Sequence, residues 1–460
     1  MESLWRKQTP NIEPKKGKEN TLSKDTHWDV IVVGAGLAGI LIAYYLMESG
    51  KKVLVLEADR IASGQTEGTT AKITSQHGLR YTKMIEELGV EAARMYAQAN
   101  ESAIREYERL IKEKDIQCDF TRCPAYLYTT GDEVLLMEEA MAAASFGIDA
   151  FFTKETEIPF PINGAVCFKK QARFSPLKFI LAIAKDLEIW EQTKVTAIKG
   201  NKVITSCGAL TADDIVVATH YPIKNLPGFY FLRQHQERSY VLALSGYKEI
   251  EGMYLGVEKD GLSLRQAGEY LLLGGGGRRT GEGCCNHGRN NSKENEQLLT
   301  GYAFLEEKAK QYFPECTIEA RWSAQDCMPH DGIPFIGRYS MFTPHLYVAT
   351  GFQKWGMTSA MLSAMLLRDA ICKIPNHYAT LFLPQRMNYK AGAKNLFTDI
   401  GVSVKGLCKG CFFRETRRCS HMGCGLKWNS KEKVWECPCH GSRFDEDGKL
   451  VDNPAKANLR

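Results

Sequence analysis

The sequence lacks any apolar run long enough to span a bilayer, and it carries little net charge for its length. A charge of +5 over 460 residues is too small to indicate a nucleic-acid-binding surface. The first 24 residues are polar and rich in lysine and lack the apolar core of a secretion signal, so we expect a cytoplasmic protein. The 15 cysteines are therefore not expected to form a secreted disulfide framework.

The composition is that of a globular protein with more than one domain. Hydrophobic residues make up 44% and charged residues 25% of the chain, and 460 residues exceed what one compact core usually holds. The cysteines are spread unevenly, with six of them between Cys408 and Cys439. This concentration predicts a separate C-terminal unit.

The segment from Trp28 to Glu57 predicts a dinucleotide-binding unit of strand, glycine turn, helix and strand. Gly34 permits the tight turn, Gly36 lets the backbone approach a pyrophosphate, and Gly39 lets the helix pack closely on the strand. The phosphates then face a helix N-terminus. Glu57 follows the second strand, where an acid can bind a ribose hydroxyl.

Several later segments suggest how the chain continues. Short alternating strands between residues 125 and 168 predict a sheet-rich second domain, and Ser175-Pro176 predicts the start of a helix. Four consecutive glycines, 274–277, predict a flexible loop, with Arg278 and Arg279 solvated after it. A strand at 346–350 followed by Gly356-Met357-Thr358 predicts a second strand–turn–helix unit whose helix N-terminus faces a ligand.

Residues 28 to about 385 resemble the flavoprotein oxidases of the D-amino-acid-oxidase superfamily, which includes glycine oxidase and sarcosine oxidase. The resemblance is carried by the glycine turn with Glu57, the loop Thr69-Thr70-Ala71-Lys72, the box from Asp331 to Gly337 and the turn from Thr350 to Thr358. It implies an α/β, Rossmann-like FAD-binding domain that is discontinuous (about 28–90, 165–225 and 320–385). An antiparallel-sheet α+β substrate domain would occupy about 91–164 and 226–319.

The resemblance also implies which residues contact FAD. Val195 would contact the adenine through its backbone, and the helix at Gly356 would face the flavin pyrimidine edge. The expected FAD contacts are Gly34, Gly36, Leu37, Ala38, Gly39, Glu57, Ala58, Thr69, Thr70, Val195, Gly337, Gly351, Gly356, Met357 and Thr358.

One departure from the family concerns the substrate. In glycine oxidase an arginine before the aspartate box binds the substrate carboxylate, and the corresponding position here is Asp326, which favours a cation. We expect a catalytic site of Lys72, Asp326 and Lys354, in which either lysine could stabilise negative charge on reduced flavin. Cys327 lies near the covalent flavin attachment site of sarcosine oxidase, but its spacing differs, so we expect non-covalent FAD.

The C-terminal cysteines and histidines form the pattern of a metal centre. Cys419-x-His421 and Cys437-x-x-His440 fit a Rieske [2Fe–2S] cluster, with two thiolates on one iron and two imidazoles on the other. A zinc site, with Cys408-x-x-Cys411 nearby, is the alternative, but it does not explain the run Cys-Pro-Cys-His-Gly-Ser. Resemblance to Rieske proteins implies a small all-β domain at 408–460 and a disulfide between Cys424 and Cys439. At position 444 a phenylalanine stands where many Rieske proteins have a tyrosine that raises the reduction potential of the cluster. We therefore expect a low reduction potential here.

These features together predict an FAD-dependent oxidoreductase. An organic donor, such as an amine or amino-acid derivative (a CH–NH or CH–NH2 donor), would reduce FAD, and the Rieske cluster would pass the electrons to an external carrier. The alternatives are electron flow in the reverse direction and a non-catalytic redox-sensing or binding module. Residues 1–27 would be a flexible or loosely docked arm, and 386–407 a linker. We expect no nucleic-acid partner.

Overall fold

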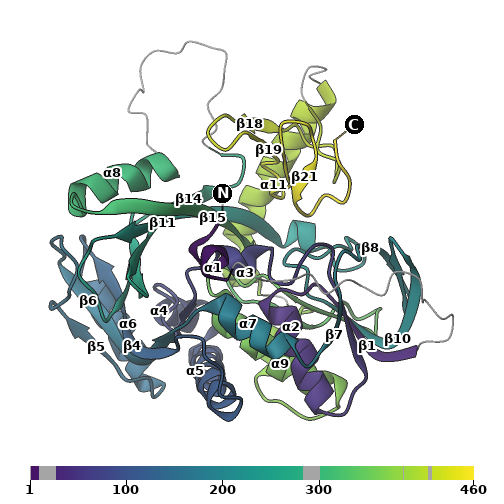
Figure 1. Cartoon of the computed structure of the whole chain (residues 1–460), viewed down its shortest axis with the longest axis horizontal. Helices are drawn as coiled ribbons and strands as arrows, with labels where there is room; N and C mark the ends of the chain where they lie inside the picture. Colours follow the sequence, from purple (N-terminus) through teal and green to yellow (C-terminus); the bar gives the residue numbers. More distant parts are fainter. Residues whose placement is uncertain (1, 10–26, 283–300, 387, 413–416, 460) are drawn as a thin grey trace.

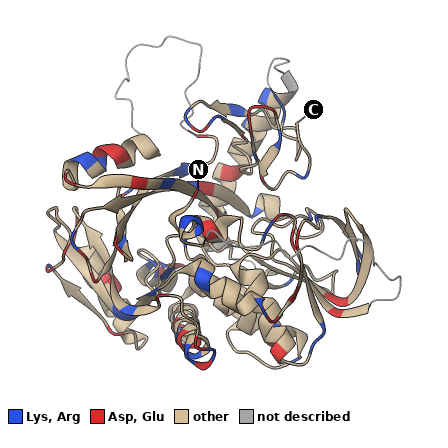
Figure 2. Cartoon of the chain, viewed as in Figure 1, with Lys and Arg blue, Asp and Glu red and all other residues tan. Residues whose placement is uncertain are grey.

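The computed structural model describes residues 2–9, 27–282, 301–386, 388–412 and 417–459. Two large sheets form the body of the molecule, and a small C-terminal domain packs beside them (Figure 1). Figure 2 shows basic and acidic residues interspersed along the chain, in agreement with the small net charge. Within the described ranges, no helix has the length and apolar character needed to cross a membrane.

The first sheet is built around the predicted dinucleotide unit. Its order is β16-β17-β10-β1-β2-β7, and the strands from β17 to β7 pair in parallel, so their carboxyl ends meet at one edge. Its strands are β1 (His27–Val33), β2 (Val53–Leu56), β7 (Glu188–Trp190), β10 (Gly208–Val217), β16 (Phe335–Arg338) and β17 (Leu346–Thr350). In addition, β9 (Lys202–Thr205) pairs with β10, and β8 (Val195–Lys199) pairs with β9.

Three helices bury one face of this sheet: α2 (Leu37–Glu48), α7 (Pro176–Ala184) and α9 (Gly356–Ile371) (Figure 1). Helix α2 is apolar on nearly all sides, which suits its position between β1 and α9. Ser175 and Pro176 begin α7 as predicted, with Ser175 at the N-cap position. The opposite face buries Ile31, Ile215 and Val217 against Tyr230 and Phe335.

The second sheet has nine strands in the order β15-β11-β14-β13-β12-β4-β6-β3, with β5 paired to β6. All pairs are antiparallel except β12 with β4. Its strands are β3 (Lys72–Ile73), β4 (Thr121–Thr129), β5 (Ala150–Thr153), β6 (Gly164–Arg173), β11 (Gln234–Ser245), β12 (Met253–Gly256), β13 (Ser263–Ala267), β14 (Tyr270–Arg279) and β15 (Thr317–Pro329). The accompanying helices include α4 (Tyr81–Leu88), α5 (Val90–Glu113), α6 (Val134–Ser145) and α8 (Tyr302–Tyr312).

The predicted combination of a parallel α/β unit with an antiparallel α+β unit is thus confirmed, but the segments divide differently. Strands β3, β6 and β15 lie in the second sheet, although the sequence predicts their residues in the FAD-binding segments. The glycines 274–277 are also not a loop, because they belong to β14. Positive φ angles at Gly275 and Gly276 and a register shift between Arg238 and Tyr240 of β11 show that glycine accommodates an irregular strand here.

The predicted N-terminal arm and the predicted linker each contain a helix among their described residues. Helix α1 (Leu4–Gln8) is docked on the body, with Trp5 buried and its indole N–H donating to Thr69 O at 2.7 Å. Residues 10–26 of the predicted arm lie outside the described part. The predicted linker 386–407 is largely helical, because α11 spans Tyr389–Phe412. The short elements α3 (Gln65–Gly68), η1 (Tyr230–Leu232) and α10 (Ala379–Phe382) complete the body.

The C-terminal domain is a four-stranded antiparallel sheet, as predicted for a small all-β unit. It consists of β18 (Lys427–Asn429), β19 (Val434–Glu436), β20 (Arg443–Phe444) and β21 (Leu450–Asp452). Two loops, before β18 and between β19 and β20, carry its cysteines and histidines. Helix α11 crosses the predicted boundary at residue 408 and packs on these loops, since a Cβ at Gly406 would collide with Cys439 Sγ.

Candidate functional site

The glycine turn after β1 has the geometry of a phosphate cradle. Gly34 has a φ of +107°, and a Cβ there would lie 2.6 Å from Ala218 O. A Cβ at Gly39 would collide with Gly34 O, so only glycine lets α2 approach β1. Gly36 caps α2, and the N–H of Leu37 donates to Thr66 Oγ1 at 3.0 Å. Free N–H groups at this helix start suit a pyrophosphate.

This turn opens into a cavity of about 1800 Å³ that reaches the second sheet. The Glu57 carboxylate lies at its nucleotide end, where it accepts from the N–H groups of Ala35 and Asp59 at 2.7 and 2.9 Å. Burial raises the pKa of Glu57. The predicted FAD contacts that line the cavity are Gly34, Gly36, Leu37, Ala38, Glu57, Ala58, Thr69, Thr70, Val195, Gly356 and Met357.

Four predicted FAD contacts do not line the cavity, and the structure gives each of them a packing role. Gly39 lets α2 and β1 meet. Gly337 and Gly351 have positive φ angles and pack against Pro384 and Pro329. The Thr358 hydroxyl is buried in α9 and donates to Thr74 O at 3.3 Å. They shape the backbone behind the cavity.

Lys72 lines the cavity from β3 and is held by two strands of the second sheet. Its Nζ donates to Tyr254 O at 2.7 Å and to Ser263 Oγ at 2.6 Å. Desolvation lowers the pKa of Lys72 to about 7, with the charge of Arg265 adding to the effect. Tyr126 and Tyr254 stack with ring centroids 4.9 Å apart, but the Tyr254 ring is buried in the core, so only its backbone carbonyl meets Lys72.

Asp326 and Lys354 also line the cavity, together with a carboxylate that the sequence did not reveal, Glu237. Glu237 on β11 is the direct cross-strand partner of Asp326 on β15, and Lys354 Nζ lies 3.4 Å from Glu237 Oε2. Burial raises the pKa of Asp326 to about 7. Burial opposes ionisation of Glu237 too, but the hydrogen bond from His235 and the charge of Lys354 lower its pKa to about 2. One carboxylate is thus fixed as an anion, and its neighbour can change charge near neutral pH.

The predicted catalytic residues therefore face one cavity but from different directions. Lys72 is held by β12 and β13, whereas Asp326 and Lys354 form one group with Glu237. Glu237 could have been found from the polar run Gln234-His235-Gln236-Glu237-Arg238, which predicts a strand with polar groups on both faces. The structure starts β11 at Gln234, the first residue of this polar run.

Beyond Glu237, a buried charge group centred on Asp399 joins the body to α11. Asp399 Oδ2 lies 3.0 Å from His235 Nδ1 and 2.6 Å from His330 Nε2, and Asp399 also pairs with Arg279. Burial opposes ionisation of Asp399, but the hydrogen bonds from His235 and His330 lower its pKa. Arg279, predicted to be solvated, also lies 3.4 Å from the carbonyl oxygens of Pro438 and Cys439. A carboxylate on α11 thus organises basic side chains from β11, β14 and the end of β15.

The four predicted cluster ligands come together in the two C-terminal loops. The Cys419 and Cys437 thiols are neighbours, and their hydrogen bond raises the pKa of Cys419. The His421 and His440 rings lie with centroids 5.0 Å apart. Among the described residues, the buried Nδ1 atoms of both histidines have no hydrogen-bond partner, as nitrogens reserved for iron would. His421 Nε2 lies 3.1 Å from Asn225 Oδ1, which fits a donating Nε2–H with Nδ1 on the metal. This donor set fits a [2Fe–2S] cluster.

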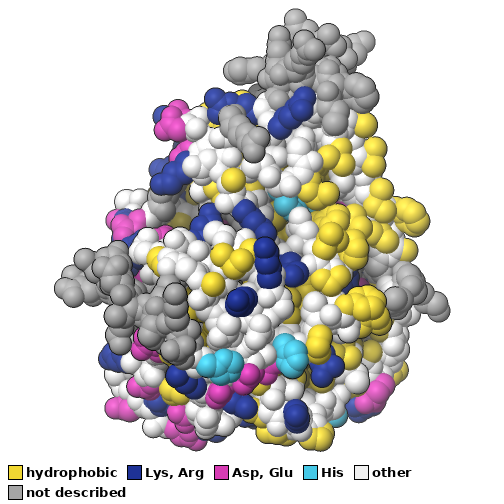
Figure 3. Space-filling view, turned by 90° about the vertical axis from the view of Figure 1, so that its right-hand side faces the viewer, with side chains coloured by type: hydrophobic (Ala, Val, Ile, Leu, Met, Phe, Trp, Pro, Cys, Tyr) yellow, Lys and Arg dark blue, Asp and Glu magenta, His cyan; other side chains and the backbone are white. Residues whose placement is uncertain are grey.

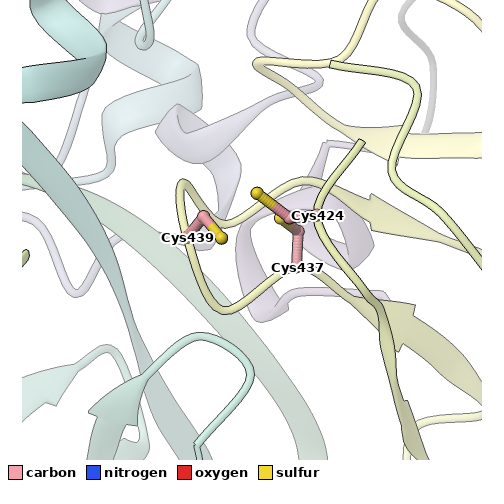
Figure 4. A group of neighbouring side chains, drawn as sticks. All are labelled: Cys424, Cys437 and Cys439. Atoms are coloured by element: carbon pink, nitrogen blue, oxygen red, sulfur yellow. The ribbon is translucent and has the colours of Figure 1, made fainter. Parts of the chain in front are cut away.

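The predicted disulfide is not formed in this structure, although its partners are close. Cys424 and Cys439 are free, and their Sγ atoms and that of Cys437 all lie within 4.8 Å of one another. Figure 4 shows the three side chains gathered between neighbouring loops. Pairing of Cys424 with Cys439 stays a prediction. Cys408, from the alternative zinc motif, is exposed on α11.

Two strands separate the cluster loops from the cavity. On one face of β11 and β15, Glu237, Ala324 and Asp326 line the cavity. The neighbouring residues of the two strands point to the other face: Gln236 donates to His440 O at 2.7 Å, and Gln325 donates to Gly441 O at 2.8 Å. Because successive side chains point to opposite faces of a strand, one layer of backbone lies between the two sites.

Ion pairs fix this arrangement. Arg278, predicted to be solvated, instead binds Glu436 at 2.9 and 3.1 Å, and Arg238 binds Glu432 at 2.9 Å. Asn453 of the C-terminal domain donates to Thr219 O at 2.8 Å, and residues 449–453 line the same cavity as the glycine turn. The C-terminal domain is thus part of the cavity wall.

Comparison with known proteins agrees with this geometry. The chain matches the FAD dependent oxidoreductase family over residues 29–370 and the Rieske [2Fe-2S] domain over residues 405–460. It is 34% identical to YhfW of Bacillus subtilis (strain 168), which carries the name of a Rieske 2Fe-2S iron-sulfur protein, over an alignment of 490 residues that covers 95% of this chain and 94% of YhfW.

Two further proteins resemble the flavin part. OrdL of Haemophilus influenzae, named as an oxidoreductase, is 24% identical over 378 residues, 76% of this chain and 84% of OrdL. The structure of glycine oxidase from Geobacillus kaustophilus superposes with a TM-score of 0.64 at 17% identity, covering 78% of this chain and 99% of that one. The predicted resemblance to the oxidase superfamily and to Rieske domains is confirmed. The chain therefore belongs to the FAD-dependent oxidoreductase family and is an enzyme of that class, with FAD and, in its C-terminal domain, a Rieske [2Fe–2S] cluster as its cofactors.

Proposed function

We propose that this enzyme oxidises an organic amine and passes the electrons, one at a time, through its Rieske cluster to an external carrier. When bound, FAD accepts two electrons from the donor, and the cluster exchanges single electrons. The observation that carries the proposal is the position of β11 and β15. Their residues alternate between the flavin cavity and the cluster loops, through Glu237 and Asp326 on one face and Gln236 and Gln325 on the other.

The cavity supports a donor with a positively charged nitrogen. Glu237 keeps its negative charge, and Asp326 takes one as the pH rises through about 7, so the two carboxylates can bind an ammonium group. Lys354 and Lys72 lie on the same cavity and would stabilise negative charge near the flavin. Solved structures of similar fold include enzymes named for glycine, L-proline and L-amino acids, which supports an amine or an amino-acid derivative.

Anaerobic titration of the enzyme with candidate amines tests this proposal. We expect loss of the oxidised-flavin absorbance and then a reduced-cluster signal in electron paramagnetic resonance, without added carrier. Asp326→Asn should weaken donor binding, whereas Asp132→Asn, an exposed change outside the cavity lining, should not. Flavin bleaching that never leads to cluster reduction would contradict intramolecular transfer. A cluster potential well below that of the flavin would instead favour electron flow from the cluster to FAD.

A further inference from the structure

Only one of the four predicted cluster ligands reaches the surface. Cys419, Cys437 and His440 are 3%, 1% and 3% exposed, whereas His421 is partly exposed. The body packs on the cluster loops through Gln236 at His440 O and through α11 at Cys439, the predicted disulfide cysteine. A partner that exchanges electrons with the cluster therefore approaches closest at the His421 edge.

Apolar side chains surround this edge on the outside of the molecule. Leu226, Phe229 and Leu232 are 55%, 46% and 43% exposed, and Met422, next to His421, is 38% exposed. Asn225 directly precedes Leu226 and contacts His421 Nε2, which places the segment of Leu226, Phe229 and Leu232 beside this histidine. We call these four residues the histidine patch. Figure 3 shows hydrophobic side chains gathered over one side of the face that it views. Contiguous exposed apolar side chains are a feature of protein interfaces.

A row of rings connects the patch to the cluster. The Phe229 and Phe231 ring centroids lie 6.1 Å apart, Phe231 and His440 lie 6.0 Å apart, and His440 and His421 lie 5.0 Å apart. The exposed Phe229 is therefore packed, through one intervening ring, against a cluster ligand. A partner seated on this patch would contact rings that lead to both histidines.

The rim of the patch carries lysines. Lys224 directly precedes Asn225, and the exposed Lys194 donates to Lys456 O at 3.0 Å. Lys456 is itself exposed and next to Ala457, whose carbonyl accepts from Ser420 Oγ at 2.6 Å, in the His421 loop. Three cations thus adjoin an apolar centre, a distribution that attracts an acidic partner and orients it.

We propose that the histidine patch and its lysine rim dock a small acidic protein that carries one electron and has a reduction potential above that of the Rieske cluster. The proposal rests on the proposed function and names the carrier's chemistry and its docking surface. In each encounter the cluster loses one electron and the oxidised carrier gains one. Two encounters account for the two electrons taken from one donor molecule, and the donor's protons pass to solvent. A second copy of the chain fits less well, because a symmetric contact would place the lysine rims against each other.

The test is a binding measurement with the flavin, the cluster and the carrier all oxidised, so that no turnover takes place. The probe is an oxidised plant-type [2Fe–2S] ferredoxin, which serves only for its acidic surface because its potential is too low for it to take electrons from a Rieske cluster. A basic cytochrome c is the protein of opposite charge. We expect micromolar ferredoxin binding that weakens with salt, and weaker binding of the cytochrome. The double variant Leu226→Gln/Phe229→Gln and the variant Lys456→Glu should each weaken ferredoxin binding by about tenfold or more.

The matched control is Leu135→Gln/Met141→Gln on α6, where the two side chains are 47% and 66% exposed and lie away from the C-terminal domain (Figure 1). It should bind ferredoxin like the unchanged protein. Each variant must keep the cluster's visible spectrum, which shows that the domain remains folded. The proposal would be overturned if the patch and control variants bound ferredoxin with equal affinity, or if the cytochrome bound more strongly than ferredoxin. It would also be overturned if the patch supported dimer formation or vesicle association instead of ferredoxin binding. The donor titration needs no carrier, so failure here leaves the proposed function standing.

Discussion

Asp326 gives the donor site a charge that changes close to neutral pH. It lies opposite Glu237 across β11 and β15, and burial raises its pKa to about 7, so it is neutral below that pH and negative above it. Binding of a cationic donor should therefore tighten as the pH rises through about 7, with KM falling about tenfold. Asp326→Asn should flatten the KM profile while an exposed change such as Asp132→Asn leaves it unaltered. A KM that rises over this range would argue against a cationic donor.

The His421–Asn225 contact should tune the cluster potential. Nε2 of His421 lies 3.1 Å from Asn225 Oδ1, and a bond donated there makes the ring a more basic ligand that favours oxidised iron. Asn225→Leu should raise the potential by about 40 mV, the equivalent of roughly 1 kcal/mol for one electron. Asn225→Asp keeps an acceptor and should not raise it. The measurement is a redox titration followed by electron paramagnetic resonance.

Cys327 lies in a position that supports non-covalent FAD. Its Sγ faces the partly buried His220, with 3.4 Å to Nε2, and Cys327 itself does not line the cavity. Burial raises the pKa of the Cys327 thiol, which leaves little nucleophilic thiolate. Acid precipitation should therefore release all FAD into the supernatant. Yellow colour that stays with the pellet, and disappears in Cys327→Ala, would show a covalent bond instead.

The site residues that sequence alone could identify are those that lie together within one short segment of the chain. The glycine turn and the two Cys–His pairs lie within short segments, so spacing is sufficient to reveal them. Glu237 and Asp326 are 89 positions apart and meet only through the register of β11 with β15. Asp399 likewise acquires its partners from three different strands or their ends. Groups assembled by tertiary pairing carry no spacing signal.

At the scale of elements, β14 shows why composition misled the prediction. Four glycines would be a mobile loop in isolation, but here both neighbours, β11 and β13, hydrogen-bond to the strand. Tertiary pairing overrides the weak intrinsic preference of glycine. The strand ends in Arg278 and Arg279, which explains why these charges are buried rather than solvated: each faces a carboxylate of another element, Glu436 or Asp399.

The Arg278–Glu436 pair should contribute to the free energy of unfolding by joining the C-terminal sheet to β14. Glu436 is 0% exposed, and although burial opposes its ionisation, Arg278 lowers its pKa to about 2. Arg278→Ala leaves that carboxylate with Arg443 at 3.6 Å and Asn429 at 3.0 Å and should cost about 2 kcal/mol in unfolding free energy, whereas the exposed pair of Arg321 with Glu306 should tolerate Arg321→Ala. Because the folded pKa is depressed, the pair's contribution is complete above about pH 4.5 and is lost as the pH falls toward 2. Thermal unfolding at several pH values measures this.

At the scale of the whole molecule, the cluster domain and the FAD cavity should depend on each other. The C-terminal residues 449–453 form part of the cavity wall, Asn453 donates to Thr219 O, and Lys194 donates to Lys456 O beside the expected adenine contact Val195. Cluster binding organises the loops that precede this segment, since metal ligation and folding are coupled in small metal domains. Removing iron should therefore loosen the wall and speed the release of FAD.

We expect FAD to dissociate about tenfold faster after iron chelation, which corresponds to losing one or two hydrogen bonds of about 1 kcal/mol each. The rise of free-FAD fluorescence after dilution measures the rate. Asn453→Ala should accelerate release with the cluster still in place, which separates loss of the wall from loss of redox chemistry. An unchanged rate in both cases would mean that the flavin domain holds FAD alone. The two modules would then exchange electrons, but cluster binding would not affect how tightly FAD is held. The contacts across β11 and β15 would serve only to set the distance between the two centres.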